Sequence, residues 1–304
     1  MHIPDGFLDA KTAIAGAAFS AAGLGMALRQ AGRRMPRKKI PLMGLAAAFV
    51  FAAQMINFPV AAGTSGHLVG AVLAAVLLGP GAAVIALSAV LIVQCLLFAD
   101  GGVSALGANI FNMALVAPVA GYGIYAAVRR TLDGARGRIA AVAFASWCST
   151  VLAALCCAGE LAWSGTVSWK AGLLAMAGVH MIIGLGEALI TALVIAAVDK
   201  SGFPESAAAK TGSSGRYGET LAFGFLIALG LALFVSPFAC PWPDGLEKVA
   251  ARLGFESQAA AQPVLSYQIP AMAAAGTITA FALSWLLARL LAPAREERTI
   301  GHRP

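Results

Sequence analysis

The sequence predicts an all-α polytopic membrane protein with about nine hydrophobic helices. Of its 304 residues, 60% are hydrophobic and 12% are charged, whereas a soluble domain carries about 25% charged residues. Several apolar runs approach the roughly 20 residues that a helix needs to cross a bilayer. The basic residues gather between those runs, which predicts an N-terminus outside and a C-terminus in the cytoplasm.

The predicted helices follow one another along the chain. Two apolar runs flank Gly79-Pro80-Gly81, and we expect them to form a hairpin whose first arm is too short to span. Irregular, Gly- and Pro-containing sequence separates the second helix from that hairpin. In order, the nine expected helices cover about residues 11–29, 40–58, 68–78, 82–99, 105–128, 139–158, 171–198, 220–235 and 269–291.

The distribution of basic residues sets the expected sidedness. The net charge is +7, and 17 of the 21 Lys and Arg residues fall in segments that this topology places inside. The densest of these segments runs from Arg29 to Lys39. Cytoplasmic loops carry such an excess of Lys and Arg. The positive charge therefore indicates topology, and no nucleic-acid partner is expected.

The composition of the sequence indicates one domain boundary. Residues 199–219 are polar and rich in Ser, Gly and Lys, a composition typical of a linker. We predict a membrane domain over residues 1–200, a cytoplasmic linker over 201–219, and a two-helix membrane module over 220–304. Residues 236–268 of that module are expected to form an outer loop.

The strongest chemical signal is the start of the chain, Met1-His2. The terminal amine, the backbone nitrogen of residue 2 and the imidazole can close two fused chelate rings, with three nitrogens at three corners of a square. Such a set suits Ni(II), Cu(II) or Co(II), whereas Zn(II) prefers a tetrahedron and Mg and Ca prefer oxygen. The prediction requires that Met1 is retained, and residues 1–10 lack the basic start of a cleaved signal. By itself, such a terminus could also be frayed and bind nothing.

A distant imidazole could fill the fourth corner, and His67 is the candidate. It ends a loop, residues 57–67, in which Pro59, Gly63 and Gly66 interrupt the helix. Irregular backbone at membrane depth is tolerated where protein or a cavity surrounds it. We therefore expect this loop to fold inward beside the N-terminus. The alternative is a histidine that only caps its own loop.

Other polar residues are candidates to support that site. Asn57, Thr64 and Ser65 belong to the same loop as His67. His180 and Glu187 are seven residues apart and share one face of a predicted helix. They could form a buried polar pair, a proton or cation element, or support for the site, and we favour support.

The sequence offers no sign of an enzyme. Residues 208–212 contain Lys-Thr but lack the glycines of an ATP-binding loop. No nucleophile lies in a recognisable pattern with a base, so no catalytic residues are expected. The chain is not expected to hydrolyse ATP itself.

Several motifs together resemble a known family. The first 200 residues or so are similar to the CbiM/NikM family, the substrate-capture (S) components of energy-coupling-factor importers for cobalt or nickel. Residues 220–291 resemble the PDGLE module, a NikN-like partner that is fused here. The motifs are Met1-His2-Ile3-Pro4-Asp5-Gly6-Phe7-Leu8, Asn57-Phe58-Pro59, Gly63-Thr64-Ser65-Gly66-His67-Leu68, Leu78-Gly79-Pro80, Asp100-Gly101-Gly102, Ala105-Leu106-Gly107-Ala108-Asn109 and Pro243-Asp244-Gly245-Leu246-Glu247.

The resemblance implies a ligand set and partners. The metal would be bound by the Met1 amine, the backbone nitrogen and imidazole of His2, and the imidazole of His67. The expected partners are a membrane-embedded coupling (T) subunit, two cytoplasmic ATPases and the lipid of the cell membrane. The segment His180 to Ala188 is similar to the family pattern H-x-x-I-G-x-x-E-G, with Ala188 in place of the last Gly.

These observations predict a substrate-binding membrane subunit of an ATP-driven importer, with Ni(II) or Co(II) as transported ligand and no cofactor. The first alternative is a stand-alone secondary divalent-cation transporter that uses His180 and Glu187, and a weaker one is an intramembrane enzyme. The donors accept either metal, and the fused module favours nickel. Because all the donors lie within residues 1–67, we expect the site to need nothing from the helices over 220–235 and 269–291. The outer loop 236–268 is expected on the same face as the site, where it could control metal entry or hold the N-terminal segment in place.

Overall fold

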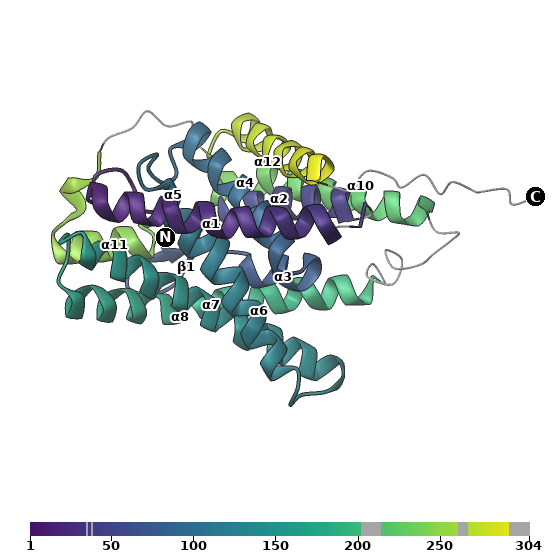
Figure 1. The fold of residues 1–304 in the computed structure, drawn as a ribbon, viewed down its shortest axis with the longest axis horizontal. Helices are drawn as coiled ribbons and strands as arrows, with labels where there is room; N and C mark the ends of the chain where they lie inside the picture. Colours follow the sequence, from purple (N-terminus) through teal and green to yellow (C-terminus); the bar gives the residue numbers. More distant parts are fainter. Residues whose placement is uncertain (35, 38, 202–213, 261–266, 292–304) are drawn as a thin grey trace, which may run out of the picture.

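The computed structural model describes residues 1–34, 36–37, 39–201, 214–260 and 267–291. These residues are mostly helical (Figure 1). The α-helices are α1 Ala10–Arg34, α2 Lys39–Gln54, α3 Ala71–Leu78, α4 Pro80–Phe98, α5 Leu106–Asn109, α6 Ala117–Val128, α7 Gly134–Trp163, α8 Trp169–Lys200, α10 Ser214–Gly230, α11 Gly245–Leu253 and α12 Pro270–Leu291. Two short strands, β1 Phe58–Pro59 and β2 Ser65–Gly66, form an antiparallel hairpin.

Seven helical segments of the described chain are long and apolar enough to cross a membrane. The 16-residue α2 and the 8-residue α3 are the shorter apolar helices of the predicted nine. A polytopic all-α membrane protein is thus confirmed, whereas its sidedness stays a prediction. The seven segments are Ala10–Arg33, Pro80–Phe98, Leu106–Val128, Gly134–Trp163, Trp169–Lys200, Gly218–Phe238 and Pro270–Leu291.

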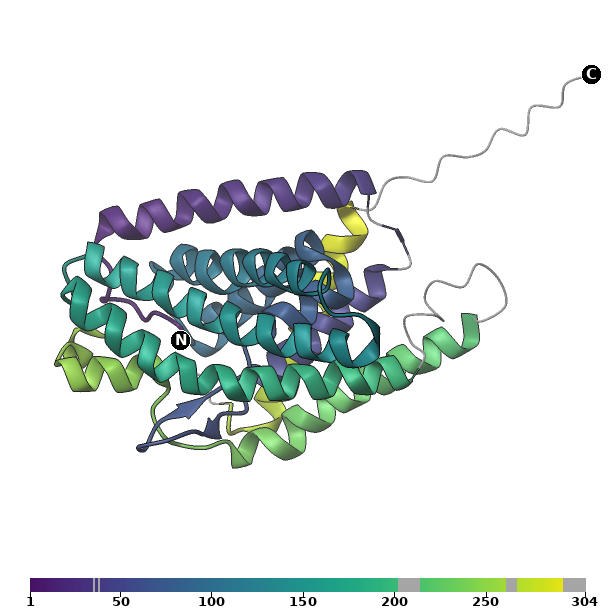
Figure 2. The same ribbon diagram turned by 90° about the horizontal axis from the view of Figure 1, so that it is seen from below.

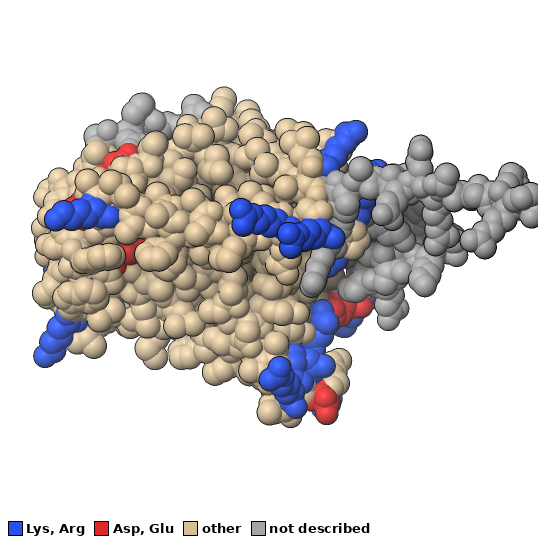
Figure 3. Space-filling view, in the orientation of Figure 1, with Lys and Arg blue, Asp and Glu red and all other residues tan. Residues whose placement is uncertain are grey.

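Helix α4 is the centre of the bundle. In its most apolar window 72% of the residues are buried, against 28% for α1. An element that is apolar all round belongs in such a position. The outer helices instead expose large apolar side chains, among them Phe19, Leu174 and Phe223, as a lipid-facing surface requires. On the face in Figure 3, Lys and Arg lie in separate groups, and uncharged surface lies between them.

Some predicted boundaries are wrong by several residues. The second helix ends at Gln54 instead of 58, because the chain turns into β1 there. Helix α7 begins at Gly134 and continues to Trp163, so it takes in residues that were expected in loops. The predicted linker is partly helical, because α10 begins at Ser214. Residues 202–213 lie outside the described residues.

The predicted helix over 105–128 is one span with an irregular middle. Residues Ile110–Val116 between α5 and α6 form a π-helical stretch. Pro118 lies two residues after this stretch and has no backbone N–H, so it cannot make the α-helical bond to the carbonyl four residues earlier. Such widened turns are local interruptions of a helix. This one lies beside the residues that hold the N-terminus.

The hairpin of short and long apolar arms is confirmed. Helix α3 ends at Leu78, Gly79 turns the chain with φ 90°, and α4 begins at Pro80. A left-handed φ favours Gly, and Pro suits the first helical position.

Helix α11 interrupts the expected outer loop. Asp244 caps it, accepting from the Glu247 backbone while the Glu247 side chain accepts from the Asp244 backbone. This reciprocal capping box was readable in the sequence as Asp-Gly-Leu-Glu. Leu246 and Val249 bury the apolar face of the helix, which packs on α8. Figure 2 shows this end of the molecule, with the N-terminus inside the bundle.

Candidate metal centre

The first residues of the chain enter the protein instead of fraying. Met1, Ile3 and Phe7 are at most 4% exposed. The Ile3 N–H donates to Asn109 Oδ1 at 2.8 Å, and the Asn109 amide donates back to the Ile3 carbonyl at 3.1 Å. The Gly102 N–H donates to the same carbonyl at 2.8 Å. Three hydrogen bonds therefore fix residue 3, and with it the positions of Met1 and His2.

The next residues are held on two sides. The Asp5 carboxylate accepts from the backbone N–H groups of Val103 and Ser104, at 3.1 and 2.8 Å. Its backbone carbonyl accepts from the Ala260 N–H at 2.8 Å. Gly6 has φ 96°, and a Cβ there would lie 2.0 Å from the Gln258 carbonyl oxygen, so only glycine fits. The N-terminal segment is thus enclosed between the membrane domain and the carboxyl-terminal module.

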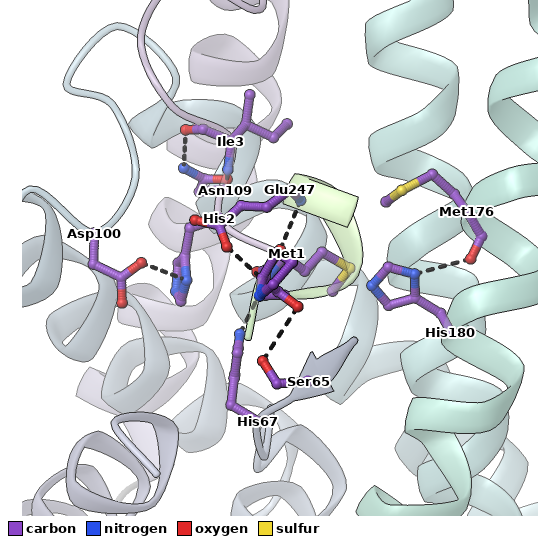
Figure 4. A network of polar contacts seen from close by, with 12 residues as sticks. Met1, His2, Ile3, Ser65, His67, Asp100, Asn109, Met176, His180 and Glu247 are labelled. Carbon is purple, nitrogen blue, oxygen red and sulfur yellow. Dashed lines mark hydrogen bonds and ion pairs between the residues drawn. The ribbon is translucent and has the colours of Figure 1, made fainter. Parts of the chain in front are cut away.

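The three predicted ligand residues come together (Figure 4). The Met1 amine lies 3.2 Å from His67 Nε2. The rings of His2 and His67 are stacked, with centroids 5.3 Å apart and planes 14° from parallel. The His67 Nδ1–H donates to the Leu68 carbonyl at 3.2 Å, which leaves the Nε2 lone pair facing the amine. Residues separated by 66 positions in sequence thus gather their nitrogens at one point.

Two carboxylates occupy this donor set in the structure. The Met1 ammonium forms an ion pair with the Asp244 carboxylate. His2 Nδ1 donates to Asp100 Oδ1 at 2.9 Å, while His2 Nε2 is buried without a hydrogen-bond partner. A chelate through the His2 backbone needs Nδ1, the ring nitrogen nearer that backbone. The residues are therefore gathered, but the four nitrogens do not yet form a square.

Burial and charge set the protonation of these groups. Burial, together with the neighbouring ammonium, lowers the pKa of His67 to about 3, so its imidazole is neutral at physiological pH. Burial alone would lower the pKa of the Met1 amine, but Asp244 outweighs it and the pKa lies above the usual 8.0. Burial opposes ionisation of both carboxylates, yet His2 lowers the pKa of Asp100 to about 2, and the ammonium lowers that of Asp244. The structure thus pairs the Met1 ammonium with Asp244 and places Asp100 against His2.

The described side chains alone do not form a metal-ligand cluster. Among the residues that the structure describes, no group of three or more His, Cys, Asp or Glu side chains is placed to hold a metal ion. Only the amine brings the donors around His2 and His67 to a number that a square-planar ion uses. A cavity of about 10 Å³ lies between Met1, His67, His180 and Asp244, room for about one water molecule.

His180 and Glu187 do not act as a pair. The His180 Nδ1–H donates to the Met176 carbonyl at 2.9 Å. The two Glu187 oxygens accept from the Val69 and Gly70 backbone N–H groups, at 2.6 and 2.9 Å. Glu187 thereby fixes the chain just after His67, which agrees with a supporting role.

The loop residues chosen as candidates bind the carboxyl-terminal module. The Ser65 N–H donates to the Pro243 carbonyl at 2.9 Å, and its hydroxyl donates to the Trp242 carbonyl at 2.7 Å. The Asn57 carbonyl accepts from the Cys240 N–H at 2.9 Å. Thr64 closes the hairpin turn, because its N–H donates to Ala61 and its carbonyl accepts from Val60.

Sequence reasoning missed three residues of the site. Asp100, Asn109 and Asp244 lay within recognised motifs, but no role was assigned to them. The outer loop 236–268 was expected to control metal entry or to hold the N-terminal segment in place, and Asp244 of that loop contacts the amine directly. In addition, the Tyr267 hydroxyl donates to Asp100 Oδ2 at 2.9 Å. The second module is therefore part of the site's surroundings.

The fold and the site define a class of protein: a multi-pass membrane protein whose buried N-terminus joins two histidines. Comparison with known proteins gives the family. Residues 2–205 match the family CbiM, described as "Cobalt uptake substrate-specific transmembrane region". The chain belongs to this family.

Relatives extend the match to both modules. The putative fused nickel transport protein NikMN of Archaeoglobus fulgidus is 36% identical over 307 residues, covering 95% of this chain and 98% of the relative. The cobalt transport protein CbiM of Acetohalobium arabaticum is 34% identical over 204 residues, covering 64% of this chain and 80% of the relative. A crystal structure of a transition metal transporter is 35% identical with a TM-score of 0.60, covering 66% of this chain and 93% of that one. The chain is thus a transport protein of the cobalt and nickel family in the cell membrane.

Proposed function

We propose that this chain is the substrate-binding membrane subunit of an ATP-driven energy-coupling-factor importer. It takes Ni(II) or Co(II) on the Met1 amine, the backbone nitrogen and imidazole of His2, and the imidazole of His67. The observation that carries the proposal is the 3.2 Å approach of the Met1 amine to His67 Nε2 beside the stacked ring of His2. The proposal includes that the working protein begins at Met1.

Metal binding replaces the contact of the Met1 amine with Asp244 and that of His2 Nδ1 with Asp100. The amine leaves Asp244 and loses its proton, and the backbone amide of His2 loses a second proton to the solvent. A half-turn of the His2 ring brings Nε2 to the side of Asp100, and the ring proton moves through solvent from Nδ1 to Nε2. Nδ1 is then free to bind the metal. A carboxylate on the outer nitrogen of a ligating histidine is a common support in metal sites.

The charge of the buried site favours a divalent ion. Beside the neutral imidazole of His67, the metal-free site holds the Met1 ammonium and the carboxylates of Asp100 and Asp244. A divalent ion that releases two protons leaves the same net charge in the same volume. No further uncompensated charge is then buried, which would be costly in a site of low dielectric constant.

Import needs partners that this chain does not supply. Its sequence has no ATP-binding loop, and the resemblance implies a coupling subunit and two ATPases. Nickel is the proposed main cargo, because the relative that matches both modules is named for nickel transport. The secondary-transporter alternative has less support, because the backbone already engages both Glu187 oxygens.

Metal content and uptake test the proposal together. Purified protein is titrated with Ni(II), then challenged with Co(II), and mass spectrometry establishes that Met1 is retained. Cells are assayed with and without the coupling subunit and ATPases. We expect one tightly bound ion per chain and uptake only with the partners. Full uptake without any ATPase would instead support the secondary transporter.

A further inference from the structure

The carboxyl-terminal module reaches the candidate site through one short segment, Cys240 to Asp244. Cys240 binds the start of the β1–β2 hairpin, and the carbonyls of Trp242 and Pro243 bind Ser65, two residues before His67. Asp244 then meets the Met1 amine. This five-residue segment thus contacts both the loop that leads to His67 and the Met1 amine.

The position of Asp244 is fixed independently of the amine. Its Oδ1 accepts from the Glu247 N–H at 2.9 Å, which caps α11, and its Oδ2 faces the Met1 amine. Helix α11 is anchored in turn, because Leu246 and Val249 are buried. A Cβ on Gly245 would lie 2.8 Å from His180 Nε2, so the start of α11 sits directly on α8. A rigid helix end therefore presents the carboxylate.

Asp244 is the carboxylate that balances the buried ammonium. Among the ion pairs of the described residues, the amine has no other carboxylate partner. Asp100, the next acidic group of the site, is engaged by His2 and Tyr267. A buried charge without a partner is strongly unfavourable. Without Asp244, the amine would have reason to leave its place beside His67.

We propose that Asp244 is a positioning residue of the metal site: it holds the Met1 amine beside His67 in the empty protein and yields it to the incoming ion. This inference rests on the proposed function. It gives the fused module a definite task, because the module supplies no nitrogen donor yet keeps one in place. Capture then starts from donors that are already gathered, so the main effect falls on the rate of association.

The substitution Asp244→Asn isolates that contact. Asn keeps a side-chain oxygen for the cap of α11, since Asn and Asp are equally good at this position, but it removes the negative charge. Asp244→Ser does the same with a shorter side chain if the first variant is unstable. Glu256→Gln is the matched control, because it removes a negative charge from an exposed position of the same module. Thermal melting of the full chain in detergent verifies that each variant is folded.

Two measurements at one fixed pH test the proposal. In the metal-free protein, mass spectrometry follows acylation of the Met1 amine by an amine-reactive reagent. In stopped flow, Ni(II) alone is mixed with the protein and the association rate is recorded. We expect Asp244→Asn to label at least several-fold faster and to bind Ni(II) about tenfold more slowly, while Glu256→Gln matches the unmodified protein.

The outcomes separate the two claims. If the unmodified protein binds Ni(II) normally but folded Asp244→Asn labels and associates at its rates, the role of Asp244 is refuted and the proposed function stands. If the unmodified protein binds no Ni(II) at all, the proposed function fails, and the role of Asp244 in capture fails with it.

Discussion

The two sides of the buried N-terminus differ in chemistry. The membrane-domain side supplies the imidazole of His67 and the amide of Asn109, which contact Met1 and Ile3 through nitrogen donors and neutral hydrogen bonds. The carboxyl-terminal side supplies the carboxylate of Asp244 and the backbone of Gln258 to Ala260. In the proposed site, the first side supplies a metal ligand and the second side holds the ligands in place. Substitutions on the first side should therefore remove binding, and those on the second should weaken it.

The largest effect within the two sides is expected for His67→Ala. This change removes one of the four proposed nitrogen donors. Loss of a residue that only supports a ligand lowers metal affinity by up to about 100-fold, so Ni(II) affinity should fall by more than that. The helices do not depend on the imidazole, and the melting temperature should change little. Isothermal titration beside a melting curve measures both. His302→Ala, a change in the tail, is the control. An unchanged affinity would remove His67 from the site.

Truncation after Lys210 should have an intermediate effect. All nitrogen donors remain, but the ion pair from Asp244 and the bonds to Ser65 and Asp5 are lost. We expect Ni(II) affinity to fall by about 10-fold, comparable to the loss of supporting residues around a metal. Metal content of the folded truncation at limiting Ni(II) measures this. An affinity equal to that of the full chain would restore the expectation of a self-contained site.

Asn109→Ala should act by loosening residue 3. It leaves the Ile3 N–H without its partner, and an unsatisfied buried group costs about 1–3 kcal/mol. We expect a measurable loss of stability together with weaker Ni(II) binding. Thr279→Ala, an exposed position on α12, is the control and should change neither. Stability loss with fully preserved affinity would show that Ile3 does not position the donors.

The pH dependence should report the amine and not His67. The Met1 pKa lies above its usual 8.0 because of Asp244, so between about pH 5 and 8 the amine is protonated in the empty protein. Metal binding must release that proton and the amide proton, so affinity rises with pH. The pKa of His67, about 3, means that its imidazole is already neutral and adds nothing to the slope. Titrations across this range should show affinity rising by up to about 100-fold per unit; a flat profile would exclude this donor set.

Much of the fold was predictable, because a bilayer requires long apolar runs in the helices that cross it and favours basic residues in the loops between them. The α3–α4 hairpin followed from Gly79 and Pro80, whose backbone preferences are local. Helix ends were less predictable. The apolar pattern placed the end of α7 near residue 158, but packing against the rest of the protein extends the helix to Trp163. Helix α11 was missed although its capping box is visible in the sequence, because its surroundings are rich in Pro and read as a loop.

The proposed donor residues could be predicted from the sequence, whereas the residues that hold them in place could not. Met1 and His2 are adjacent, so their chelating geometry follows from covalent structure alone. The pairing of Met1 with Asp244 joins residues 243 positions apart, and no local pattern carries that information. The same holds for Asp100, which reaches His2 from the turn after α4. Long-range contacts of this kind depend on how the two modules pack.

The most direct test of the central claim is a single added residue before Met1. The added residue moves the free amine out of chelate reach and turns the Met1 nitrogen into an amide, while every side chain is unchanged. Ni(II) titration should show that tight binding is lost, whereas a protein with the same residue added after Pro304 should bind as the unmodified chain does. Tight, unchanged Ni(II) binding by the N-terminally extended protein would contradict the account.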